Sequence, residues 1–274
     1  MIDAALPVAM FDSGVGGLTV LHECLVALPQ EDYVYLGDTA WFPYGPRDPD
    51  QLRERIALIT EKLLARGVKL VVIACNTATA IGEGVAREVA ARYGVEVVPV
   101  VAPQAEIAAA ITDNARVGVL ATTNTVESGA YRRALEAEGR GLDVIEVAAP
   151  RLAPFIQEGS LFDEETMAMA RGYCAPLREA GIDTLILGCT HFPLVAPMLQ
   201  RILGRNVRLV SGGHAVAAAI QRTLEGAGLA RDGDVEGTYE FFCTGPVSSF
   251  GEVATRFLQM PLGEVRQVEF TVPA

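Results

Sequence analysis

Two kinds of hydrophobic pattern alternate along the chain. Short apolar runs rich in β-branched residues predict buried strands, and longer stretches with apolar residues every three or four positions predict amphipathic helices. The expected strands cover residues 7–11, 33–36, 71–74, 95–101, 116–120, 142–147, 184–188, 207–210, 239–243 and 265–272. The expected helices lie between them and include residues 18–28, 105–111, 127–138, 194–203, 215–225 and 249–258.

This regular alternation predicts an α/β fold with largely parallel sheets and helices on both faces. The two halves of the chain also resemble each other in outline. A strand, a polar loop and a helix follow one another at Asp12-Ser13 and again at residues 122–125, and a strand leads into Cys75 and again into Cys189. We therefore expect two similar open α/β domains that face each other across a cleft, with the active site in that cleft.

Cys75 and Cys189 are the strongest chemical signal in the sequence. Each ends a buried strand, and Asn76-Thr77 or Thr190 then begins the next segment. Open α/β sheets bind their ligands at the carboxyl ends of strands, and a helix N-terminus favours an anion or a thiolate. Two thiols on facing domains can serve as base and acid on opposite sides of one carbon atom, so the pair predicts proton-transfer chemistry.

Polar groups beside the cysteines predict a site for a small carboxylate. Asn76, Thr77 and Thr190 are donors that can bind one carboxylate together with the N–H groups of a helix start. The loop Pro43-Tyr44-Gly45 can offer backbone N–H groups to a second anionic end, although Pro43 itself has none.

The loop Asp12-Ser13-Gly14-Val15-Gly16-Gly17 joins the first expected strand to the first expected helix. Its glycines permit close approach of the backbone to a ligand. It has neither the lysine of a P-loop nor the glycine spacing of a dinucleotide-binding fold, so we do not expect nucleotide binding. Asp12 can accept a hydrogen bond from an ammonium group or a thiol, or simply cap the helix, and Ser13 can bind a carboxylate.

His191 follows Cys189 by two positions. In an extended segment such side chains point the same way, so the imidazole can exchange a proton with the thiol. A Cys-x-His pair can also be half of a metal site, but the sequence shows no companion cluster of Cys or His, and we expect no metal. Cys24, Cys174 and Cys243 fall among apolar residues and are expected to be buried structural thiols.

Composition narrows the class of partner. The chain has 274 residues, of which 50% are hydrophobic and 20% charged, and its formal net charge is −12. This balance is typical of a globular protein and argues against binding to nucleic acid or to an anionic membrane surface. The N-terminus shows no secretory pattern, and no apolar run approaches the roughly 18 residues that would span a bilayer. The five cysteines do not suggest a disulfide framework, so we expect a cytoplasmic protein with reduced thiols.

Several segments together resemble the signature segments of the glutamate racemases, within the aspartate/glutamate racemase superfamily. They occur in the family's order and at its approximate spacing, and the match covers nearly the whole chain. The segments are Asp12-Ser13-Gly14-Val15-Gly16-Gly17-Leu18-Thr19-Val20, Gly37-Asp38-Thr39-Ala40, Pro43-Tyr44-Gly45, Ala74-Cys75-Asn76-Thr77-Ala78, Leu187-Gly188-Cys189-Thr190-His191 and Phe242-Cys243-Thr244-Gly245.

The resemblance implies interconversion of L-glutamate and D-glutamate without a cofactor, which supplies D-glutamate for peptidoglycan. It implies that Cys75 takes the α-proton of D-glutamate with help from Asp12, and that Cys189 takes that of L-glutamate with help from His191. Further residues are implied to bind the amino, α-carboxylate and side-chain carboxylate groups of the substrate: Ser13, Asn76, Thr77, Thr190, Pro43, Tyr44, Gly45, Thr122 and Thr125.

The resemblance also implies how the chain divides. Residues 1–100, completed by residues 209–274, would form the first domain, and residues 101–208 the second. Members of the family are often homodimers, although the sequence shows no interface pattern.

Some positions differ from the family pattern and leave alternatives open. Gln157 stands where a glutamate is usual near the Cys189 side, and Ser211-Gly212-Gly213 replaces a usual Asp-Ser-Gly. One alternative is a racemase, isomerase or decarboxylase of the same superfamily that acts on another substrate, such as aspartate. Others are a thiol hydrolase that uses Cys75 alone and a non-catalytic protein that binds glutamate.

Overall fold

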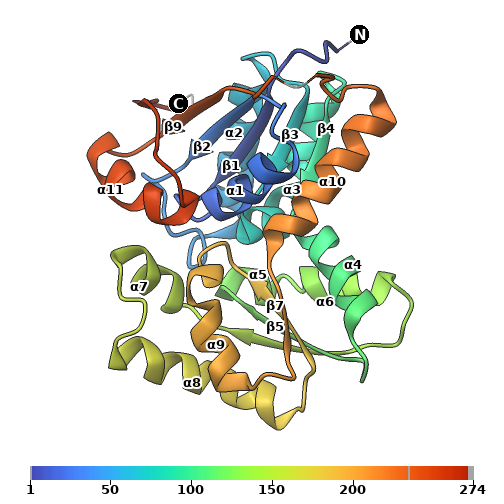
Figure 1. Ribbon diagram of the computed structural model, residues 1–274, viewed down its shortest axis with the longest axis vertical. Helices are drawn as coiled ribbons and strands as arrows, with labels where there is room; N and C mark the ends of the chain where they lie inside the picture. The colour runs from blue at the N-terminus through green and yellow to red at the C-terminus, as the bar shows by residue number, and fades with distance from the viewer. Residues whose placement is uncertain (1, 234, 271–274) are drawn as a thin grey trace.

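The protein folds into two α/β lobes, seen in a computed structural model that describes residues 2–233 and 235–270 (Figure 1). The upper lobe in this view holds a six-stranded sheet with strand order β10-β9-β2-β1-β3-β4, and the lower lobe holds a four-stranded sheet with order β6-β5-β7-β8. All neighbouring strands run parallel. The predicted α/β class with two parallel sheets is confirmed.

The first sheet is buried on both faces. Met10 belongs to one hydrophobic cluster with α1 (Leu18–Ala27), α10 (Gly212–Ala227) and α11 (Val247–Leu258). Phe11 points the other way and packs with α2 (Pro49–Leu64) and α3 (Asn76–Ala91). This two-sided burial explains the continuous apolar runs of the strands: β1 (Val8–Asp12), β2 (Tyr33–Gly37), β3 (Leu70–Ile73), β4 (Glu96–Pro99), β9 (Tyr239–Cys243) and β10 (Val265–Gln267).

The second sheet is smaller and is also flanked by helices. Its strands are β5 (Arg116–Ala121), β6 (Asp143–Ala148), β7 (Thr184–Gly188) and β8 (Arg208–Val210). Its helices are α4 (Val101–Ile111), α5 (Thr123–Glu127), α6 (Ala130–Ala137), α7 (Leu152–Glu158), α8 (Glu164–Glu179), the 3₁₀ helix η1 (Phe192–Val195) and α9 (Ala196–Leu203).

The chain passes between the lobes after β4 and again after β8, and the segment from α10 to β10 then returns to the first sheet, where β9 pairs with β2. The expected limit between residues 208 and 209 falls within β8, which pairs with β7. We propose that the first domain comprises residues up to Val100 and from Ser211 onward, with the second domain between them.

Several element limits differ from the hydrophobic pattern. The helix expected at 127–138 is divided into α5 and α6 because Gly129 adopts a φ of 64° between them. The helix α7 was not expected, since its seven residues are too few to show a helical period. The last expected strand, 265–272, ends at Gln267, and residues 271 and 272 lie outside the described part of the chain.

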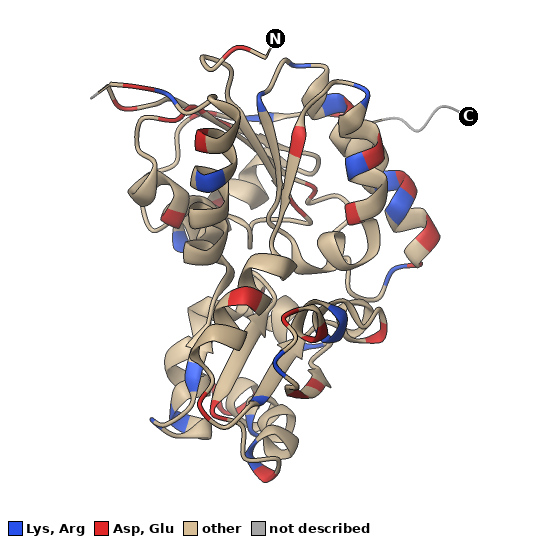
Figure 2. Ribbon diagram, turned by 90° about the vertical axis from the view of Figure 1, so that its right-hand side faces the viewer, with Lys and Arg blue, Asp and Glu red and all other residues tan. Residues whose placement is uncertain are grey.

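Charged residues lie mainly on the helices and loops at the outside of both lobes, where Lys and Arg alternate with Asp and Glu (Figure 2). Within residues 2–233 and 235–270, no helix combines the length and the apolar character that a membrane span needs.

Candidate active site

Cys75 lies where β3 passes into α3. It is the N-cap residue of α3, and its Sγ accepts a hydrogen bond from the backbone N–H of Ala78 at 3.4 Å. Its thiol also lies 3.7 Å from Ser13 Oγ, on the loop that follows β1. Because β1 and β3 are adjacent parallel strands, their carboxyl ends bring this loop and the thiol together.

Cys189 lies at the equivalent point of the second sheet, directly after β7, and its Sγ is 3.9 Å from Nδ1 of His191. Both thiols line one buried cavity between the lobes, about 20 Å³ in volume. The cavity brings together most of the side chains predicted for the site: Ser13, Pro43, Tyr44, Gly45, Asn76, Thr77, Thr122, Thr190 and His191, with Phe42 and Ala153 in addition.

Burial dominates the acidity of both thiols. Together with a smaller contribution from the nearby Asp12 carboxylate, it raises the pKa of the Cys75 thiol well above its usual range and that of the Cys189 thiol to about 12. Hydrogen bonds from backbone N–H groups oppose this effect but do not outweigh it. The helix start therefore does not produce a thiolate at either cysteine, contrary to the tendency expected from sequence, because loss of hydration outweighs the field of the helix.

Asp12 and Asn76 each have a buried side-chain oxygen without a partner, and Asn76 lines the cavity whereas Asp12 lies behind its lining residues. Asp12 Oδ2 accepts hydrogen bonds from the N–H of Gly17 at 2.9 Å and from Thr190 Oγ1 at 3.4 Å. Its Oδ1 and the Oδ1 of Asn76 are buried and have no hydrogen-bond partner among the described residues. Burial raises the pKa of Asp12. Two unpaired buried acceptors are suited to receive a cationic group such as an ammonium.

The loop after β1 allows the lobes to approach each other. A Cβ atom on Gly16 would collide with the Thr190 hydroxyl and the His191 ring, and one on Gly17 would lie 2.7 Å from the Cβ of Asp12. Close packing between the lobes thus requires Gly16, and close packing within the first lobe requires Gly17.

Three threonine hydroxyls from both lobes form a cluster beside the cavity, which Thr77 and Thr122 line and Thr125 does not. Thr77 Oγ1 lies 2.8 Å from Thr122 Oγ1, Thr122 Oγ1 lies 3.0 Å from Thr125 Oγ1, and Thr125 donates to Thr77 at 3.3 Å. Their only partners within the described residues are one another, so Thr77 and Thr122, which line the cavity, can turn their hydrogens toward an acceptor in it, while Thr125 supports them from behind.

The loop that carries Tyr44 and Gly45 is held by a buried network that sequence reasoning missed. The Tyr44 hydroxyl points away from the cavity and donates to Asp38 Oδ2 at 2.5 Å. The same carboxylate accepts hydrogen bonds from Nε and Nη2 of Arg55, at 2.9 and 2.6 Å, and from the hydroxyl of Thr244 at 2.7 Å. The backbone N–H groups of Tyr44 and Gly45 have no acceptor among the described residues and lie at the cavity.

His191 is a neutral imidazole with a defined hydrogen position. Burial lowers its pKa to about 3, and its ring packs between Phe42 and Phe257, with ring centroids 5.3 and 5.0 Å away. Its Nε2 lies 3.0 Å from Oε1 of Gln157 on α7. With the Gln157 amide in this orientation its oxygen accepts, so Nε2 carries the hydrogen and Nδ1, without one, faces Cys189. Gln157 therefore orients the His191 ring by hydrogen bonding.

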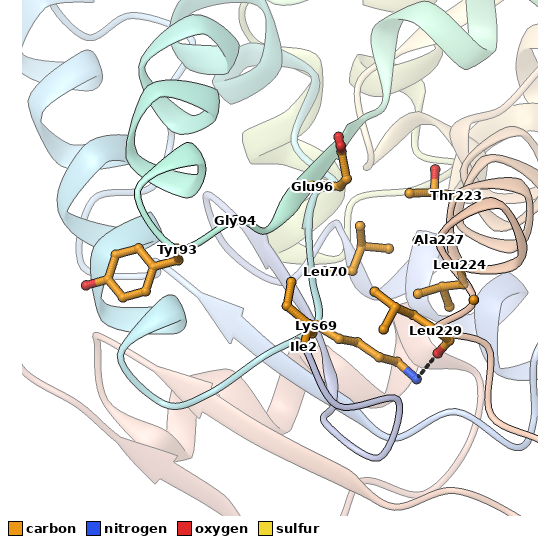
Figure 3. A pocket seen from close by; sticks show the side chains of 11 residues that line it. Ile2, Lys69, Leu70, Tyr93, Gly94, Glu96, Thr223, Leu224, Ala227 and Leu229 are labelled. Atoms are coloured by element: carbon orange, nitrogen blue, oxygen red, sulfur yellow. Dashed lines mark hydrogen bonds between the residues drawn. The ribbon is translucent and has the colours of Figure 1, made fainter.

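A second, larger cavity of about 710 Å³ lies at the opposite end of the first sheet, beside the first residues of β3 and β4 (Figure 3). The ammonium group of Lys69 in its wall is already bound by Glu31 Oε2 at 2.5 Å and by the carbonyl oxygens of Ala4 and Leu229 at 2.6 and 2.9 Å. This cavity holds neither cysteine of the pair. The small cavity, at the carboxyl ends of the strands, is where an α/β sheet binds its ligand.

Two parallel α/β lobes with a cysteine from each facing one buried cavity define a class of protein as well as a fold. Residues 13–220 match the Asp/Glu/Hydantoin racemase family, and the chain belongs to this family.

Within it, the chain is similar to glutamate racemases. It is 43% identical to that of Mycobacterium leprae, over 94% of each chain, and 44% identical to that of Saccharopolyspora erythraea, over 92% of each. Its structure is similar to glutamate racemase isoform RacE1 from Bacillus anthracis, with TM-score 0.91, 32% identity and coverage of 98% of this chain and 99% of that one. The structure is also similar to a glutamate racemase from Francisella tularensis in complex with D-glutamate, with TM-score 0.90, 28% identity and coverage of 97% of this chain and 98% of that one.

Proposed function

We propose that this protein interconverts L-glutamate and D-glutamate by proton transfer between two thiols. The observation that carries the proposal is that Cys75 and Cys189, which follow equivalent strands of the two sheets, line the same buried cavity. Family membership supports the reaction class, and the glutamate racemases among its relatives support the substrate.

In the proposed mechanism one cysteine is the base and the other is the acid. With D-glutamate, the Cys75 thiolate takes the α-proton, and the Cys189 thiol gives its proton to the opposite face of the same carbon, which leaves Cys189 as the thiolate. The reverse transfer converts L-glutamate. Each direction therefore uses one thiolate and one thiol and returns them exchanged, so no net proton is consumed.

Neighbouring groups ionise each thiol in this proposal. Because its pKa is raised, the Asp12 carboxylate is suited to receive the proton of the Cys75 thiol. The Nδ1 atom of His191 carries no hydrogen and is suited to receive the proton of the Cys189 thiol. A bound ammonium beside Asp12 would also favour the thiolate state, because it adds a positive charge within a site of low dielectric.

The remaining polar groups would bind the substrate's charged ends. The unpaired oxygens of Asp12 and Asn76 suit the ammonium, and Ser13, Thr77 and Thr190 suit the α-carboxylate. The N–H groups of Tyr44 and Gly45 and the hydroxyls of Thr122 and Thr125 suit the side-chain carboxylate. Fixed donors to the α-carboxylate are the means by which a site without pyridoxal phosphate stabilises negative charge that develops at the α-carbon.

The setting of the reaction is part of the same proposal. The mechanism needs free thiols, all five cysteines are unpaired, and thiols stay reduced in the cytoplasm, where we propose that the protein acts. Its D-glutamate would be used for peptidoglycan, and its working form would be a homodimer, which light scattering of the purified protein would test.

The experiment that tests the proposed function follows D-glutamate in deuterated water, without pyridoxal phosphate and with a reductant. Loss of the circular dichroism signal together with deuterium at the α-carbon is expected, while D-aspartate in a parallel reaction should remain unchanged. Conversion of D-aspartate alone would assign another substrate, and binding of glutamate without exchange would leave only a binding protein.

The variants Cys75→Ser and Cys189→Ser test the two-thiol mechanism. We expect each to lower kcat by about 10²–10⁴-fold in both directions, the usual contribution of one general acid or base. Cys243→Ser, at a buried cysteine away from the cavity, is the control and should retain activity. A thiol hydrolase that uses Cys75 alone would instead tolerate the loss of Cys189.

A further inference from the structure

Gln104 is a fully buried amide on α4 that connects the two cysteine-bearing parts of the molecule. Its side chain is 0% exposed. Its Nε2 donates to the carbonyl oxygen of Leu187, two residues before Cys189, at 3.2 Å, and to that of Val210, the last residue of β8, at 3.3 Å. Its Oε1 accepts from Nδ2 of Asn76 at 2.9 Å, just after Cys75. One side chain thus bonds to segments that lead to both thiols.

The backbone determines which way the Gln104 amide faces. Carbonyl oxygens accept hydrogen bonds and cannot donate, so the NH₂ group of Gln104 must face Leu187 and Val210. The oxygen of Gln104 then faces Asn76 and the hydroxyl of Tyr131, which donates to it at 2.5 Å. Because this oxygen can only accept, Asn76 must present its own NH₂ group to it.

Tyr131 also binds the NH₂ group of Asn76. Its hydroxyl gives its hydrogen to Gln104 and accepts from Nδ2 of Asn76 at 2.6 Å. The NH₂ group of Asn76 is therefore bound by Gln104 and Tyr131, and its oxygen, buried and without a partner among the described residues, is left for the cavity that Asn76 lines.

We infer that Gln104, together with Tyr131, is a positioning residue that fixes the Asn76 amide with its oxygen toward the substrate ammonium. The inference rests on the proposed function, since it concerns the amino group of the same amino-acid substrate. The reversed amide would present its NH₂ group to the ammonium and would set two oxygens against each other at Gln104. The orientation of Asn76 is thus determined by two backbone carbonyls on the far side of Gln104.

The test compares two ligands that differ at the amino group. Glutarate has the two carboxylates of glutamate and no ammonium. Racemic glutamate gives no net reaction on a racemase, so calorimetric titration measures its binding directly. We expect the wild-type protein to bind racemic glutamate more tightly than glutarate. Gln104→Met should reduce this preference about tenfold, which is the usual effect of losing one hydrogen bond to a charged group. The affinity for glutarate should change little.

Control variants separate orientation from structure. Gln200→Met removes another glutamine whose Nε2 donates to two carbonyl oxygens, those of Gly204 and Val207, both at 2.8 Å, away from the cavity, and it should keep the full preference. Tyr131→Phe removes one bond to Asn76 and should lower the preference by less than Gln104→Met. In an Asn76→Ala background, Gln104→Met should change the preference no further.

The outcomes decide between a positioning role and a purely structural role for Gln104. Equal losses for both ligands in Gln104→Met would mean a structural role and would overturn the inference, as would a wild-type protein without preference for glutamate. If Gln104→Met does not fold, an unchanged preference in Tyr131→Phe would overturn it. Failure of the proposed function is seen separately, as absence of α-deuterium exchange in a protein that still binds glutamate.

Discussion

His191 shows how the environment of a single residue differs from what its spacing suggests. Spacing predicts that its imidazole lies beside the Cys189 thiol, and the two lie 3.9 Å apart. The structure adds that the ring is enclosed by Phe42 and Phe257 and oriented by Gln157. Enclosure lowers the pKa of His191 to about 3, so the residue is a neutral acceptor at physiological pH.

This burial of a neutral imidazole makes the stability of the folded protein depend on pH. The unfolded chain protonates His191 near pH 6.5, and the folded chain does so only near 3, so the unfolded state binds the extra proton between these values. The free energy of unfolding should therefore fall as pH decreases from 6.5 to 3. This group contributes a slope that approaches about 1.4 kcal/mol per pH unit.

Urea unfolding of the wild-type protein and His191→Asn at several pH values between 4 and 7 measures this slope. The difference in slope should correspond to about one proton. His214→Asn, at a side chain that is 78% exposed, is the control for loss of a histidine elsewhere in the chain. Equal slopes in wild type and His191→Asn would contradict the burial of a neutral imidazole.

At the scale of elements, the loop between β2 and α2 illustrates how a buried ion pair positions backbone at a site. Asp38 and Arg55 are almost fully buried, with side chains 0% and 4% exposed. Arg55 comes from α2, Asp38 from the loop itself and Thr244 from the segment after β9, so three elements converge on one carboxylate. Tyr44 is bonded to the same carboxylate, which fixes the loop backbone at the cavity.

Arg55→Met should lower the free energy of unfolding by about 3–5 kcal/mol, because it leaves the Asp38 carboxylate buried without its counter-charge. Arg53→Met is the matched control on the same helix. Its side chain is 49% exposed and pairs with an exposed Asp50, so its loss should cost less than about 1 kcal/mol. Thermal and urea unfolding compare the two, and equal losses would show that the Asp38 network does not stabilise the loop.

At the scale of the whole molecule, the two lobes are closed on each other. The cavity of about 20 Å³ has room for little more than a water molecule, so the lobes must separate before an amino acid can reach the thiols. Asn124 on α5 holds the lobes together at the cavity: its Nδ2 donates to the carbonyl oxygens of Tyr44 and Arg47 at 3.1 and 2.7 Å. These bonds join the second sheet's lobe to the loop after β2.

Asn124→Ala should therefore weaken the closed state and raise the rate constants for association and dissociation of glutamate by about tenfold, the effect of losing two hydrogen bonds. Trp41, the one tryptophan of the chain, lies in the same loop and can report ligand binding by stopped-flow fluorescence. Asn114→Ala is the control, because its side chain also forms two hydrogen bonds but both lie within the second lobe. Unchanged rates in Asn124→Ala would show that another contact limits opening.

The sequence by itself determined the parts of this protein that depend on local pattern. Alternating apolar runs and amphipathic stretches were enough for the parallel α/β class, because buried strands and helices have different periods. The residues that follow β3 and β7 could be chosen for the same reason, since the carboxyl ends of parallel strands meet at one edge of a sheet.

The tertiary structure alone decided the features that depend on distant segments. Gln104, Tyr131 and Arg55 carry no local signal, because their roles arise from partners 17 to 106 residues away in the chain. The pKa of the Cys189 thiol, raised to about 12, likewise depends on how completely the lobes exclude water, which no spacing along the chain reveals. Sequence names the candidate groups of the site, and packing between the lobes determines their charge and orientation.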